Sequence, residues 1–62
     1  MNQRLAANKA VIDGQLFTNH VVELQHGVFV KHYRLTEELP HVEWLREVVI
    51  EGGVVRRIVR LL

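Results

Sequence analysis

The chain has 62 residues, a formal net charge of +1, and neither cysteine nor serine. The missing residues exclude disulfides, thiolate metal sites and acyl transfer by a serine or cysteine nucleophile. A charge this mild does not require a nucleic acid or an anionic membrane as partner, and no apolar run is long enough to cross a bilayer. We therefore expect no membrane association and, by default, a cytoplasmic location.

A chain of this length forms one domain at most, so residues 1–62 are predicted to be a single β domain. Such a domain buries only about 60% of the surface that its unfolded chain exposes, which leaves a thin margin of stability. The chain is 48% hydrophobic, more than one thin core can hide. We therefore expect a homo-oligomer, with a dimer favoured, or another protein partner.

Glycines divide the chain into strands. Gly14, Gly27 and the pair Gly52-Gly53 each lie between runs of β-branched and aromatic residues, as is typical of hairpin turns. The chain's one aspartate, Asp13, precedes the first of these turns, where its side chain is expected to bond the local backbone. The predicted strands are Leu5–Ile12, Leu16–Leu24, Val28–Leu35, Leu45–Glu51 and Val54–Leu61. The fold predicted is all-β, with a five-stranded antiparallel hairpin or meander sheet that closes as a small sandwich or barrel.

The segment between the third and fourth strands has a different character. Thr36 is a helix-capping residue and Pro40 opposes propagation, so we expect one short helical turn or a loop near residues 36–41. An alternative starts a helix at Pro40 and extends it through Val49. The β-branched run 48–50 before the glycine pair favours a strand instead.

Register around the turn at His26-Gly27 decides which side chains share a face. A two-residue loop places His20 opposite Tyr33, whereas a three-residue loop ending in a glycine bulge places His20 opposite His32. The bulged register gathers the aliphatic residues better. In either register the opposite face stays apolar and needs cover from another chain or partner. The residues expected to line that interface are Phe17, Val21, Phe29, Tyr33 and Leu35.

Four histidines make a metal site worth testing, because imidazole is the commonest metal ligand. In the bulged register His20 and His32 lie within reach of one metal ion, and they are the metal candidates of this chain. No third ligand is placed near them, and neither HxH nor HExxH spacing occurs. We therefore predict no metal and no cofactor, with His26 in a turn and His41 in a loop.

The last strand contains three arginines among aliphatic residues: Arg56, Arg57 and Arg60. A basic ridge of this kind would suit phosphate groups, so a small β-barrel that binds nucleic acid is the alternative function. Nucleic-acid binding of this type usually adds exposed aromatic rings for stacking, and the aromatic residues here are needed for packing. We favour arginines that protect an edge strand from unwanted pairing while their stems cover apolar surface.

Two stretches, 8–14 and 21–30, resemble the opening hairpins of the small β-sandwich that flanks the barrel in metal-dependent amidohydrolases. Residues 48–51 and 54–59 resemble the strands that complete that sandwich. In that family the metal ligands and the catalytic acid belong to the barrel, which is missing here, so the resemblance transfers no catalytic residue. It implies a free-standing sandwich half whose barrel-facing surface has another partner. The chain also resembles small bacterial proteins of similar length, which implies no activity.

These observations predict that the chain is not an enzyme and has no catalytic residue. The function expected is a small non-catalytic structural or protein-interaction domain that self-associates through an apolar sheet face.

Overall fold

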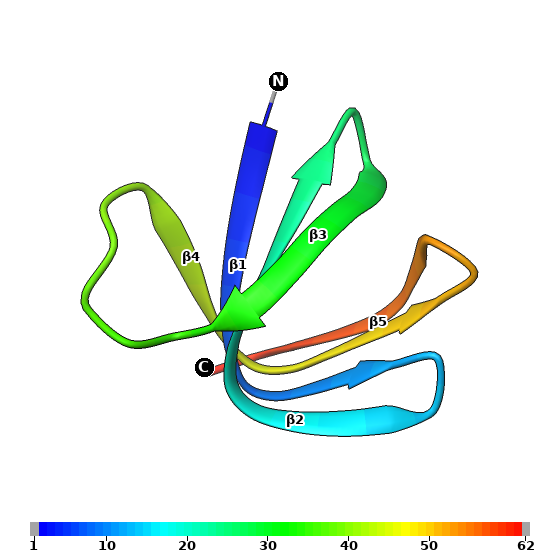
Figure 1. Ribbon diagram of the computed structural model, residues 1–62, viewed down its shortest axis with the longest axis horizontal. Helices are drawn as coiled ribbons and strands as arrows, with labels where there is room; N and C mark the ends of the chain where they lie inside the picture. Colours follow the sequence, from blue (N-terminus) through cyan, green and yellow to red (C-terminus); the bar gives the residue numbers. More distant parts are fainter. Residues whose placement is uncertain (1, 62) are drawn as a thin grey trace.

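The computed structural model describes residues 2–61, which form five strands and no helix (Figure 1). The all-β prediction is thus confirmed. No helix in this part of the chain is long and apolar enough to span a membrane. The strands are β1 (Asn2–Ile12), β2 (Gln15–Gln25), β3 (Val28–Arg34), β4 (Val42–Glu51) and β5 (Val54–Arg60).

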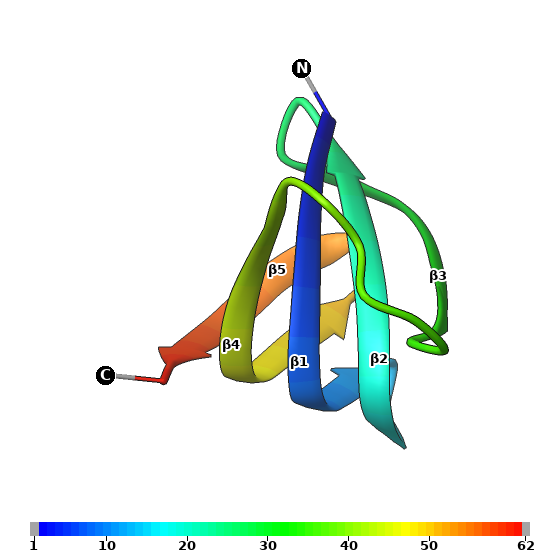
Figure 2. The same cartoon turned by 90° about the vertical axis from the view of Figure 1, so that its left-hand side faces the viewer.

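The five strands form one mixed sheet in the order β3-β2-β1-β4-β5. Neighbouring strands are antiparallel except β1 and β4, which are parallel, so the prediction of an all-antiparallel sheet is wrong. The cause is the connection 35–41, which leaves the end of β3 and returns the chain to the end of the sheet where β1 begins (Figure 2). A strand that enters from that end must run parallel to β1.

The connection 35–41 contains no helical turn, so that prediction and the alternative helix from Pro40 are both wrong. His41 has φ 56°, a left-handed conformation that ends any helix, and β4 begins at the next residue. The segment instead crosses over β1 and β2 on the side of the sheet away from the core, which we call the outer face (Figure 2). There Ala6 and Val21 are 0% exposed, so the chain itself supplies cover that we had expected from a partner.

Each hairpin turn has positive φ at both central residues: Asp13-Gly14 (50° and 84°), His26-Gly27 (54° and 79°) and Gly52-Gly53 (57° and 77°). Two consecutive left-handed residues are what a type I′ turn requires, and this turn matches the twist of the flanking strands. The three predicted turns are confirmed. The predicted local bonding of Asp13 is wrong, because its carboxylate accepts a hydrogen bond from the N–H of Gly52 at 2.9 Å, in another hairpin.

The central strands bend sharply in the middle (Figure 1). In β1 the core face receives Ala7 and then Ala10, an interval of three where regular alternation gives two. In β2 the same interval separates Phe17 from His20, both of which face the core side, and Asn19 between them has φ 48°. Such irregularities increase the local twist, so the sheet curls around its own core. The core consists of Leu5, Ala7, Ala10, Ile12, Val22, Leu24, Leu45, Val48 and Ile50, with Phe17, Phe29, Val55 and Ile58 packed against it.

The edge strands β3 and β5 contact each other, but the sheet is open between them. Among residues 2–61, one backbone hydrogen bond crosses this gap, from the N–H of Phe29 to the carbonyl of Gly53 at 3.1 Å. Closure would need a continuous ladder between the two edges, and the β4–β5 turn reaches β3 only near its start. The predicted closure into a sandwich or barrel is therefore not supported.

The register between β2 and β3 combines parts of both predicted options. The loop has two residues and pairs Leu24 with Phe29, but the register then shifts by one between Glu23 and Leu24. The bulge thus lies inside the hairpin and not at its turn. Beyond the shift His20 is the partner of Arg34, so neither predicted register is correct along the whole hairpin.

Candidate functional site

His20 and His32 lie together although they are not register partners. The Nε2 atom of His20 is 2.7 Å from the Nδ1 atom of His32, so one of the two rings donates a hydrogen bond to the other. His20 is 6% exposed, whereas His32 is exposed. Phe17 stacks on His20 with ring centroids 4.5 Å apart, and Phe29 stacks on His32 at 5.8 Å. Aromatic rings therefore hold both imidazoles in place.

This histidine pair lacks the ligands of a metal centre. Burial, and secondly the positive charge of His32, hold the pKa of His20 below its usual value. Within residues 2–61 no three His, Cys, Asp or Glu side chains are grouped so that they could hold a metal ion. The two histidines offer two nitrogens facing each other, and this arrangement links β2 to β3.

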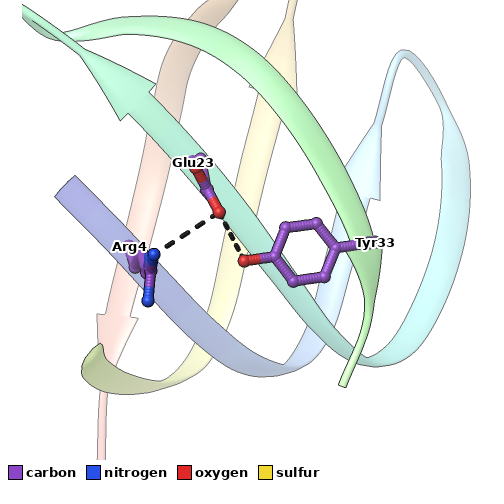
Figure 3. Close-up of polar contacts among 3 residues, drawn as sticks. All are labelled: Arg4, Glu23 and Tyr33. Atoms are coloured by element: carbon purple, nitrogen blue, oxygen red, sulfur yellow. Dashed lines mark hydrogen bonds and ion pairs between the residues drawn. The ribbon is translucent and has the colours of Figure 1, made fainter. Parts of the chain in front are cut away.

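A second polar cluster on the outer face joins β1, β2 and β3 (Figure 3). The hydroxyl of Tyr33 donates a hydrogen bond to the Oε2 atom of Glu23, and the Nε atom of Arg4 lies 3.6 Å from the same oxygen. The sequence did not single out this cluster. It forms because the register pairs Val21 with Tyr33, which leaves Glu23 diagonal to the phenol on the same face.

The chemistry of this cluster favours a protonated phenol. The hydrogen bond to Glu23 raises the pKa of Tyr33 above its usual value, burial and the carboxylate charge raise it further, and Arg4 opposes them. A phenol shifted in this direction is a poorer base and nucleophile at neutral pH. A shallow hollow of about 240 Å³ lies beside it, lined by Tyr33, Arg34, Leu35, Thr36, Glu37 and Leu39.

The five predicted interface residues do not form one surface. Phe17 and Phe29 pack against the core, whereas Val21 is fully buried on the opposite face. Tyr33 and Leu35 are half-buried beside the hollow. The set is divided because the bends interrupt the regular alternation of side chains between the two faces of the sheet. Residues an even number of positions apart on opposite sides of a bend therefore point to different faces.

The outer face of the other half of the sheet, beyond the bends, has an apolar surface. Alternation from the core residues Ile12 and Ile50 places Val11 and Val49 on this face, and the two are register partners. The same alternation adds residues from β2 and β5. We call this surface the valine face, and it consists of Val11, Leu16, Val49, Val54 and Val59. Leu16 on β2 and Val54 on β5 are 58% and 51% exposed, whereas Val11, Val49 and Val59 are half-buried.

Two opposite charges lie on the same face between the valines. Lys9 and Glu47 are register partners on the parallel strands β1 and β4. Lys9 is exposed and Glu47 is half-buried. The valine face therefore has a positive and a negative group side by side on its two central strands.

The three arginines of the nucleic-acid alternative do not form one free cluster. Arg56 lies 3.4 Å from a carboxylate oxygen of Glu51, and Arg60 lies 3.4 Å from one of Glu43. Arg57 is the register partner of Val49 and two positions from Val59, so it lies on the valine face. Because two of the three guanidinium groups already contact carboxylates, the positive charge available to a phosphate backbone is reduced.

Comparison with protein-family models, curated proteins and solved structures gave no match. The resemblance of the hairpins to the amidohydrolase sandwich therefore stays a prediction.

Proposed function

We propose that this chain is a non-catalytic structural or interaction domain that forms a dimer through the valine face, packed against the same face of a second copy. The observation that supports it most directly is the exposure of this face. Leu16 and Val54 are more than half exposed, whereas the connection 35–41 crosses over the other half of the outer face. Two such faces pack at the usual distance between stacked sheets, about 10 Å.

The charges on the valine face favour a second copy as the occupant. A two-fold axis that brings the two faces together can place Lys9 of each copy near Glu47 of the other. At these two central positions the surface is complementary to itself in charge, in addition to its apolar residues, while Arg57 lies on the edge strand β5.

The edge strands, in contrast, are unsuited to pairing with themselves. Every charged side chain on β3 and β5 is basic: Lys31, Arg34, Arg56, Arg57 and Arg60. Like charges would meet if two copies paired edge to edge, and basic residues on an edge are a common defence against such pairing. Face-to-face association avoids this repulsion.

Sedimentation equilibrium over about a hundredfold range of concentration tests the proposal. The test variant combines Leu16→Lys with Val54→Lys, which places charge on the valine face without touching the core. The matched control combines Val28→Lys with Val30→Lys, which are 58% and 53% exposed but lie on β3, outside the valine face.

We expect the wild type and the control to be dimeric at the upper concentrations, and the test variant to be monomeric with an unchanged circular dichroism spectrum. A monomeric wild type at every concentration would overturn the proposal. Equal dissociation of the control and the test variant would place the interface elsewhere and would also overturn it.

A further inference from the structure

The contact between His20 and His32 is the only side-chain hydrogen bond between β2 and β3 on the core face among residues 2–61. One ring must act as donor and the other as acceptor, because the two nitrogens are 2.7 Å apart. Phe17 lies against both imidazoles, at 4.5 Å and 5.0 Å between centroids. The rings have little freedom to turn away from each other while β3 stays on β2.

Among residues 2–61, no ion pair or hydrogen bond joins either imidazole of the pair to a carboxylate that could balance added charge. Along the row of register partners, His20 lies between Arg34 on β3 and Ala7 on β1, and the row continues through Leu45 to Arg60. The guanidinium of Arg60 already contacts a carboxylate. The core residues of β1, β4 and β5 are aliphatic.

The remaining groups near the pair do not supply a negative charge either. Lys31, the neighbour of His32 along β3, is basic, and its ammonium group lies over the Tyr33 ring at 5.8 Å. Glu23 is the charged group of β2 and lies on the outer face with Tyr33. No Asp or Glu occurs on β3.

We infer that the His20–His32 contact is a pH-sensitive latch that holds the edge strand β3 on β2 at neutral pH and releases it in mild acid. The first proton is tolerated, because a protonated imidazole can donate to a neutral one. A second proton removes the acceptor and leaves two positive charges in contact, with no carboxylate of the described residues bonded to either ring. The inference concerns β2 and β3, and it does not depend on dimer formation through the valine face.

The direction of the pH dependence follows from the burial of His20. Its pKa is lower in the folded chain than the ordinary value of 6.5. The contribution of the latch is therefore complete above about pH 6.5 and is lost as the pH falls through the lower pKa of the folded state. The open state binds more protons, so each additional proton favours opening by up to about tenfold per pH unit.

Amide hydrogen exchange measured by NMR between about pH 7 and pH 5 tests the latch. The reporter is the N–H of Leu35, which bonds the carbonyl of Asn19 at 2.8 Å and joins the end of β3 to β2. The reference is the N–H of Asp13, which bonds the carbonyl of Ile50 at 2.9 Å, away from β3. After correction for intrinsic exchange, we expect the protection of the Leu35 amide to decrease as the pH is lowered, while the protection of the Asp13 amide stays constant. Equal losses at both amides, or no loss at either, would overturn the inference.

The variant His32→Gln keeps a polar group at an exposed position but cannot take up a proton. It should abolish the pH dependence at Leu35, whereas His41→Asn, in the connection before β4, should retain it. Full pH dependence in His32→Gln would contradict the latch. Should that variant fail to fold, the NMR titration of His20 in the wild type decides, because its pKa must lie below the usual value, and an ordinary or raised pKa would overturn the inference.

Discussion

A hydrogen bond between Asp13 and Gly52 joins the first hairpin turn of the chain to the last one. The Oδ1 atom of Asp13 accepts the N–H of Gly52 at 2.9 Å, across a separation of 39 positions. The backbone N–H of Asp13 also donates to the carbonyl of Ile50 at 2.9 Å. Together these bonds fix the β1–β2 turn to the β4–β5 turn, at the end of the parallel pairing between β1 and β4.

Replacing Asp13 by alanine should lower the free energy of unfolding by about 1 to 2 kcal/mol. The variant loses the acceptor for Gly52 and places a methyl-bearing residue at φ 50°. Asp13→Asn is the matched control, because asparagine keeps an acceptor oxygen and tolerates the left-handed conformation. Urea unfolding compares the three proteins. Equal losses in the Ala and Asn variants would show that the bond to Gly52 contributes nothing.

The phenol of Tyr33 should titrate above its ordinary pKa of 10.0, because its hydrogen bond to Glu23 favours the protonated form. A pKa raised in the folded state gives stability that is complete below about pH 10 and is lost as the pH rises through the folded value. The chain has one tyrosine, so the ultraviolet absorbance of the phenolate reports this group alone. Phenolate formation at or below pH 10 would contradict the expectation.

The variant Tyr33→Phe separates the hydrogen bond from the packing of the ring. We expect it to lower the free energy of unfolding at neutral pH by about 1 kcal/mol. In this variant the free energy of unfolding should also decrease less steeply as the pH rises above about 10. Chemical unfolding at neutral and alkaline pH measures both effects, and an unchanged alkaline slope would assign that loss to other groups.

Truncation of Leu45 tests whether the assigned core residues stabilise the fold. Leu45 is 1% exposed, and truncation of such a leucine to alanine costs about 2 to 5 kcal/mol. A domain of this size has about 3 to 9 kcal/mol in total, so Leu45→Ala should be largely unfolded at moderate temperature. Val30→Ala, at a 53% exposed position on β3, should stay within about 0.5 kcal/mol of the wild type. Thermal unfolding followed by circular dichroism distinguishes them, and similar midpoints would contradict the assigned core.

The turns were the most predictable feature, because Asp13-Gly14, His26-Gly27 and Gly52-Gly53 are local signals for left-handed backbone. The strand pairing was not predictable in the same way. The parallel contact of β1 with β4 depends on the path of residues 35–41, and no local pattern in that segment specifies where it leads. The predicted helical turn failed for this reason, since Thr36 and Pro40 are compatible with a loop as well as with a cap.

The candidate sites were predictable only as far as the register was. The proximity of His20 and His32 was expected from a bulge, but the bulge lies within the hairpin and not at its turn. The Glu23–Tyr33 bond was missed because it depends on the same shift. The valine face was missed because core positions lie three apart in β1 (Ala7 and Ala10) and in β4 (Leu45 and Val48), which changes the positions that point outward. Such bends leave no clear mark in a hydrophobic pattern.

The central position of β1 has a consequence for how the molecule folds. Strand β1 is the first along the chain, yet it lies between β2 and β4, so in the order of the sheet it separates the hairpin β2–β3 from the hairpin β4–β5. Each hairpin can form quickly around its own turn, whereas pairs such as Val11 with Val49 require closure of a long loop before they stabilise anything. We therefore expect the docking of the β4–β5 hairpin on β1 to be the slow step of folding, and the Asp13–Gly52 bond to form only when that step is complete.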